Sequence, residues 1–251
     1  MSALDGRPAR SRWWSGGARA LWGPVRDFGR AELGAPVGEV WRRLRTGGVL
    51  AVPLTLTACV GIVALQVLQH LRGASDWVDR LGGVYATLPW WQALLRTPLS
   101  LFVPDPSLPI WGLMLQVVVV FGIAETTLGA RRTLGVALLA TLAGTAFARY
   151  SLWTGPGGFL GLPTSDLLVR DTGPSAAVVA LGLYVACRYR AWWTAAAIVA
   201  AMVIEVVTIT NLAGFEHLAG AAAILLLTAF ETWTGLAPPT PARPGADTLT
   251  R

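Results

Sequence analysis

Long apolar segments recur along this chain of 251 residues, and they constrain the fold more than any other feature. A helix of about 20 mostly apolar residues spans the hydrocarbon core of a bilayer. With 54% hydrophobic and 14% charged residues, the chain is too apolar for an ordinary soluble domain. We therefore predict an all-α polytopic membrane protein. Its six transmembrane helices are expected at residues 47–71, 108–124, 133–153, 173–187, 191–210 and 217–233.

The positive charges flank the apolar segments and do not gather on a polar module, which argues against a nucleic-acid partner. All 20 are arginine, and fifteen of them fall on one side of the predicted helices, against five on the other. Arginine-rich connections stay in the cytoplasm as a rule. We therefore expect a multi-pass protein of the plasma membrane with both termini in the cytoplasm.

The predicted membrane domain covers residues 47–233 and is flanked by two tails. Residues 1–46 interleave tryptophan with arginine, which is typical of a segment lying on the anionic inner leaflet, but a disordered basic tail fits equally well. Residues 234–251 are rich in proline and threonine and predict a disordered cytoplasmic tail. Between the first two spans, the aromatic residues of 72–109 predict short helices in the membrane interface.

Ser175 and His217 each fall in the first turn of a predicted helix, and both helices start on the outer side. A hydroxyl and an imidazole at the same depth are the minimum for nucleophilic catalysis in a bilayer. Two plainer interpretations stay open. Ser175 could be a small packing residue at a helix start, and His217 an interfacial histidine. Asp171 is expected to cap the Ser175 helix, and Gly220 to let helices approach closely.

Four further polar or flexible residues stand out within or beside the spans. Glu125 and Gly129 close the second span, where a carboxylate and a bend predict a structural role. Arg149 and Glu205 lie within the outer parts of their segments, where an unpaired charge costs about 2.5–3.5 kcal/mol on insertion scales. We predict that these two charges pair, although Glu205 could instead orient His217.

Neither a metal nor a cofactor is expected. The two cysteines, Cys59 and Cys187, lie in apolar segments at different predicted depths. We interpret them as small core residues and expect no disulfide or metal site between them.

These motifs, in this order, resemble the rhomboid family of membrane proteins. The preceding outer loop and the six helices add to the resemblance, which covers residues 70–233. More closely, the segment 171–175 is similar to the Asp-x-Gly-x-Ser form of a rhomboid-like group of actinobacterial membrane proteins. The motifs that carry the resemblance are Glu125-x-x-x-Gly129, Gly173-x-Ser175 and His217-x-x-Gly220.

The resemblance implies a six-helix rhomboid-like bundle acting as an intramembrane serine protease. Ser175 would be the nucleophile and His217 the general base, in a dyad that cleaves transmembrane segments of other membrane proteins. Backbone N–H groups near Ser175 would hold the oxyanion, with Gln116 as an additional candidate.

The chain also departs from the protease pattern. Ala176 and Val179 replace a glycine and a tyrosine, and Pro109 and Leu113 stand where the proteases carry oxyanion donors. The alternative is therefore a non-catalytic rhomboid-like protein that binds transmembrane clients in the bilayer. A transporter is disfavoured because no inverted repeat is visible.

Overall fold

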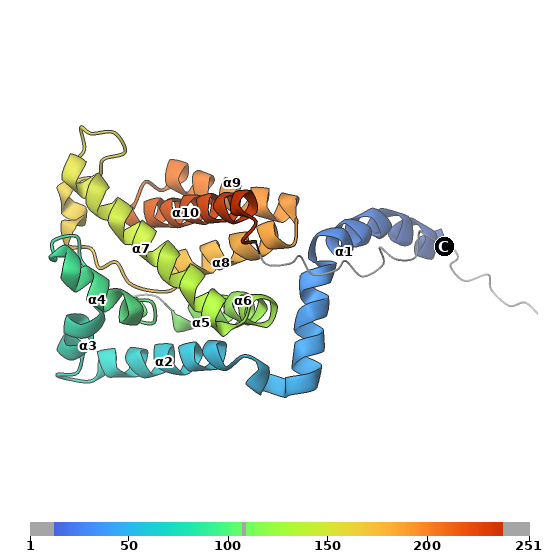
Figure 1. The fold of residues 1–251 in the computed structure, drawn as a ribbon, viewed down its shortest axis with the longest axis horizontal. Helices are drawn as coiled ribbons and strands as arrows, with labels where there is room; N and C mark the ends of the chain where they lie inside the picture. The colour runs from blue at the N-terminus through green and yellow to red at the C-terminus, as the bar shows by residue number, and fades with distance from the viewer. Residues whose placement is uncertain (1–12, 107–108, 238–251) are drawn as a thin grey trace, which may run out of the picture.

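The computed structural model describes residues 13–106 and 109–237. These residues form helices joined by loops, with no β-strand among them. Figure 1 shows the helices as one bundle, from which α1 projects. The α-helices are α1 (Trp13–Gly47), α2 (Pro53–His70), α3 (Ser75–Gly82), α4 (Trp90–Ser100), α5 (Ile110–Gln116), α6 (Gly122–Leu128), α7 (Ala130–Thr154), α8 (Ser175–Arg188), α9 (Trp192–Thr208) and α10 (Leu212–Thr234). Three short helical turns complete the set: η1 (Gly48–Ala51), η2 (Val117–Phe121) and η3 (Thr164–Leu168).

Among the described residues, four helical segments are long and apolar enough to cross a membrane, which agrees with the predicted all-α membrane protein. They are α2, the continuous segment Ile110–Leu128, α7 and α10. The apolar helices α8 and α9 are shorter, at 14 and 17 residues. Each predicted span thus contains an apolar helix, but length and composition mark only four of them as candidate spans.

Helix starts differ from the predicted ones where a capping residue was overlooked. The last helix begins at Leu212, because the Asn211 side chain accepts a hydrogen bond from the backbone N–H of Gly214 at 2.8 Å. His217 therefore lies in the second turn of α10 and not in the first. The predicted cap of α8 is also wrong. Pro174 precedes the helix, no side chain caps it, and Asp171 lies upstream in the connecting loop.

Small residues bring α7 and α10 into close contact at the centre of the bundle. A Cβ atom added to Gly144 would come within 3.2 Å of the Glu216 Cβ and carbonyl oxygen. One added to Gly220 would come within 3.4 Å of the Ala140 carbonyl oxygen. Helices in lipid associate through such close packing, since lipid tails are as apolar as the side chains.

The bundle has two distinguishable ends (Figure 1). At one end, here named the α3–α4 end, α7 finishes and α8 and α10 begin, next to the short helices α3 and α4, which fall in the segment where short helices were predicted. An isolated bridge between Val84 and Asp171 ties the two connecting loops together there. At the other, the α6–α7 end, α6 turns into α7 through Gly129, whose φ of 83° is a conformation suited to glycine.

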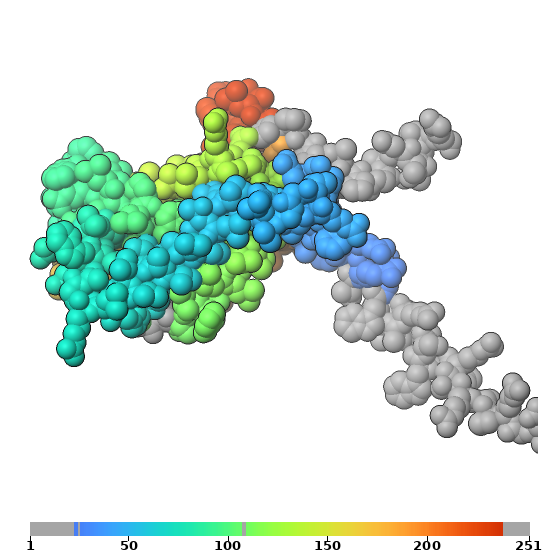
Figure 2. Space-filling model, turned by 90° about the horizontal axis from the view of Figure 1, so that it is seen from below, coloured from blue at the N-terminus to red at the C-terminus, as the bar shows by residue number. Residues whose placement is uncertain are grey.

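The N-terminal region is helical from residue 13, in the segment for which a leaflet-bound tail and a disordered tail were both left open, while residues 1–12 lie outside the described ranges. Two prolines lie inside α1, and Figure 1 shows the helix bent, as internal prolines require. Glu32 accepts hydrogen bonds from the N–H and hydroxyl of Thr194, at 3.1 and 3.2 Å. Figure 2 shows α1 and α2 following one another across one face. The predicted C-terminal tail beyond residue 237 lies outside the described residues.

Candidate functional site

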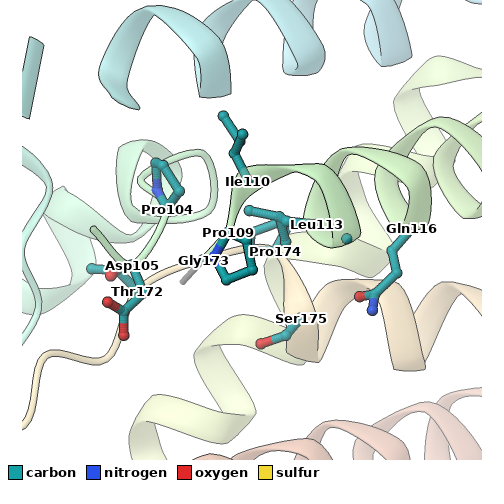
Figure 3. Close-up of a pocket in the computed structure, with 11 residues that line it drawn as sticks. Pro104, Asp105, Pro109, Ile110, Leu113, Gln116, Thr172, Gly173, Pro174 and Ser175 are labelled. Atoms are coloured by element: carbon teal, nitrogen blue, oxygen red, sulfur yellow. The ribbon is translucent and has the colours of Figure 1, made fainter. Parts of the chain in front are cut away.

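Ser175 opens onto a cavity of ≈ 310 Å³ between the start of α8 and α5. Most of its lining is apolar, including Pro109, Ile110 and Leu113, and Gln116 lines the same cavity (Figure 3). The predicted nucleophile and the additional oxyanion candidate thus share one space. Figure 3 shows the hydroxyl of Ser175 pointing away from the Gln116 amide.

The backbone before Ser175 fixes where its side chain emerges. Gly173 has a φ of 111°, which L-residues rarely adopt, and its N–H donates to the Ser100 carbonyl oxygen at 2.9 Å. This contact holds the start of α8 against the end of α4. Ser175 itself is half-buried, and its hydroxyl has no hydrogen-bond partner among the described residues.

His217 is engaged by another helix and does not line the Ser175 cavity. Its Nδ1 lies 3.1 Å from Oε2 of Glu205 on α9, and its Nε2 is buried without a partner. Within the described ranges, no hydrogen bond joins His217 to Ser175. The expected dyad is therefore not assembled in this structure, although the imidazole is held by a carboxylate and keeps one nitrogen unused.

The expected pair of Arg149 and Glu205 does not form. Arg149 donates from its guanidinium to the Tyr85 carbonyl oxygen at 3.1 Å, and its Nε is buried without a partner. Glu205 contacts His217 instead, which is the alternative left open by the sequence. The two side chains do not pair because they point in different directions. Arg149 on α7 faces the connection between α3 and α4, while Glu205 on α9 faces α10.

A cluster of two carboxyl groups lies at the same end and was missed from the sequence. Asp171 accepts a hydrogen bond from the Thr145 hydroxyl at 2.6 Å and shares another with Glu216. Burial raises the pKa of Asp171, while the bonds to Thr145 and Glu216 and the nearby Arg149 charge oppose this shift. A bond between two carboxyl groups needs a proton on one of them. The available signal was an acid inside an apolar segment, directly before His217.

The α6–α7 end holds a different kind of carboxylate. Glu125 accepts hydrogen bonds from Leu54 N–H at 2.8 Å, Thr55 N–H at 2.7 Å and the Thr55 hydroxyl at 2.8 Å. It therefore caps the N-terminus of α2 from another helix. Glu125 and Gly129 lie at the turn where a structural role was expected.

The described residues contain no cluster of three or more His, Cys, Asp or Glu side chains suited to a metal. Cys59 and Cys187 are free, and both pack against the hydrophobic core. No family model, curated protein or solved structure matches the chain. The likeness to rhomboid proteins accordingly stays a prediction from the motifs.

Proposed function

We propose that this protein is a rhomboid-like membrane protein that binds transmembrane segments of other membrane proteins at the Ser175 cavity. The observation that carries the proposal is the composition of this cavity: a mainly apolar lining, one unpartnered hydroxyl and no imidazole. Its volume of ≈ 310 Å³ lies at the lower end of the range for ligand pockets, about 300–1,000 Å³, and suits a few side chains of a helix.

The surroundings of α5 give such a segment a route through the bilayer. Trp111 and Leu115 of α5 are 80% and 65% exposed, so this helix presents an apolar face outward beside the cavity. A client segment in the lipid would meet this face first. Polar groups at depth, here Ser175 and Gln116, then offer hydrogen bonds to a client backbone that has lost its own helical bonds.

The proposal includes a six-span topology with both termini in the cytoplasm. The 14 residues of α8 give it a length of about 21 Å, less than the hydrocarbon core. A helix this short suits a start below the membrane surface, beneath the connection that carries Asp171. The arginine distribution supports the orientation, since the richer side belongs in the cytoplasm.

Intramembrane proteolysis is the second candidate, and the contact between Glu205 and His217 favours it. A carboxylate on Nδ1 with Nε2 left unused is how a catalytic histidine is oriented. Cleavage would additionally require the Ser175 hydroxyl to come within about 2.6–3.2 Å of that nitrogen. Client binding would have to bring about this rearrangement, which is why binding is the primary proposal.

Filling the cavity tests the binding proposal. Gly112 lines the cavity, and a Cβ atom there meets nothing within 4 Å, so Gly112→Leu should be tolerated by the fold while occupying client space. We expect weaker energy transfer between labelled transmembrane peptides and the protein in liposomes. Gly135→Leu on α7, at a similarly open position, is the matched control. Equal binding by both variants would contradict the proposal.

A fluorophosphonate probe separates binder from protease. A binder should bind client peptides, remain unlabelled and leave the peptides intact. A protease should be labelled and cleave, with both signals lost in Ser175→Ala and kept in Ser165→Ala, an exposed serine elsewhere. Cleavage that also disappears in His217→Ala would establish the second candidate.

A further inference from the structure

The part of α1 that leads toward α2 carries one row of exposed side chains, here named the α1 row. Its members follow one another at steps of three or four residues, so they lie along one face of the helix. They are Arg30, Leu33, Val37, Trp41 and Arg45, and all five are exposed. The row therefore has an apolar centre and an arginine at each end.

The two acidic residues of this stretch, Glu32 and Glu39, do not pair with the α1 row. Glu32 accepts hydrogen bonds from the N–H and hydroxyl of Thr194 at the start of α9. Glu39 forms ion pairs with Arg42 and Arg43. Both carboxylates are thus engaged with groups outside the row, and the row keeps its positive charge.

The C-terminal end of the α1 row combines charge with aromatic and aliphatic surface. The Arg45 guanidinium carbon lies 4.4 Å from the centroid of the Trp41 ring, and Trp41 is 58% exposed. The next turn, η1, exposes Val49 and Leu50 by 68% and 78%. Arginine and tryptophan beside exposed aliphatic side chains are typical of a helix that lies in the headgroup region and buries its apolar side chains in the acyl boundary.

The direction of this part of α1 fits the same environment. Figure 1 shows α2 and α10 running along one common direction, and the part of α1 next to α2 crossing that direction at the α6–α7 end. Contacts of α1 with α6 and α9 hold it there. A helix that crosses the spans at one end of a membrane bundle lies along the bilayer surface.

We propose that the α1 row binds the anionic lipid surface of the inner leaflet. Arg30 and Arg45 contact lipid phosphates, since guanidinium groups match phosphate oxygens in geometry and charge. The three apolar side chains between them enter the acyl boundary. The inner leaflet is negatively charged and faces the arginine-rich end of the bundle in the orientation proposed above. The inference uses that orientation, and it does not require client binding at the Ser175 cavity.

The test uses the full-length protein in nanodiscs, with hydrogen exchange measured for the backbone amides of residues 28–47. Discs of phosphatidylcholine are compared with discs of equal parts phosphatidylcholine and phosphatidylglycerol. Phosphatidylglycerol should slow exchange about fivefold for each arginine at the anionic surface, because a helix held there opens less often. The slowing should shrink in Arg30→Gln and in Arg45→Gln. It should persist in Arg72→Gln, an exposed arginine at the α3–α4 end.

The apolar centre of the α1 row is tested by fluorescence. Subtracting the emission of the Trp41→Phe variant from that of the wild type isolates the emission of Trp41. Lipids brominated on their acyl chains should quench this emission, because the ring lies in the acyl boundary.

Three results would overturn the proposal. The first is equal exchange of residues 28–47 in the two lipid compositions, and the second is equal effects of Arg45→Gln and Arg72→Gln. The third is a Trp41 emission that brominated acyl chains leave unchanged. Slowing of exchange by an added polyglutamate peptide, with none by phosphatidylglycerol, would assign the α1 row to an acidic protein partner instead.

Discussion

Two buried glutamates at opposite ends of the bundle differ in how many hydrogen bonds their carboxyl groups receive. Glu125, at the α6–α7 end, accepts three hydrogen bonds of 2.7–2.8 Å from the start of α2. Glu216, at the α3–α4 end, has one carboxyl oxygen, Oε1, without a hydrogen-bond partner among the described residues. Its carboxyl group is hydrogen-bonded to another acid, Asp171. One carboxylate is satisfied by the fold, and the other is not.

Other unpartnered groups follow the same division. Six side chains in the described ranges have a buried polar atom without a hydrogen bond, and five of these belong to the α3–α4 half of the bundle. Tyr189 is the exception, and the five are Gln66, Arg149, Ser151, Glu216 and His217. Unsatisfied polar groups are costly in lipid, so their concentration at one end marks the end where function is expected. The Ser175 cavity opens at that end.

The largest effect is expected from Glu125→Ala. The change leaves three donors of Leu54 and Thr55, two of them buried, without an acceptor, so the free energy of unfolding should fall by about 3 kcal/mol or more. Thermal unfolding in detergent measures this. Glu216→Ala, which removes a carboxylate that is not fully satisfied, is the comparison and should be less destabilising. The reverse order would break the distinction between the two glutamates.

An intermediate effect is expected from Gly144→Leu. The new Cβ atom would lie 3.2 Å from Glu216, so α7 and α10 would have to separate, at a cost of about 1–3 kcal/mol. Gly135→Leu on the same helix has open space and should change the unfolding temperature little. Equal unfolding temperatures for both variants would show that the two helices do not depend on this contact. The burial of the unpartnered atoms of Glu216 and His217 on α10 could then not be attributed to the close packing of α7 and α10.

The positions of the helices could be predicted from the sequence, but the partners of the polar groups could not. The length of an apolar segment can be read directly from its residues, so every predicted span contains an apolar helix. Several predicted bounds are wrong: α2 begins at Pro53, the second segment continues to Leu128, and α10 begins after its cap Asn211. Which polar side chains pair depends on how each helix is rotated about its axis relative to its neighbours. Each residue along a helix turns the side-chain direction by about 100°, so a small error in rotation changes the predicted partner. The need to neutralise Arg149 and Glu205 was visible in the sequence. That Glu205 instead meets His217 follows from how α9 and α10 pack.

The smallest effect concerns pH and the acidic pair. Because burial raises the pKa of Asp171 above its ordinary value of 3.8, the folded state binds a proton more tightly than the unfolded chain. The resulting stabilisation is complete below that ordinary value and is lost as pH rises through the raised pKa of the folded state. The unfolding temperature of the wild type should therefore decline over this interval.

Asp171→Asn removes the titrating group but can keep the hydrogen bonds to Thr145 and Glu216, so its unfolding temperature should depend less on pH. Asp166→Asn, in the same connecting segment but only half-buried at its η3 turn, is the control and should follow the wild type. A wild-type protein that becomes more stable as pH rises through this range would mean that Asp171 is held as a carboxylate. Arg149 and Thr145 would then stabilise the Asp171 carboxylate, much as the donors at the start of α2 stabilise the Glu125 carboxylate. Of the described acidic and histidine side chains at the α3–α4 end, only Glu216 and His217 would then differ from Glu125 in having an unpartnered atom.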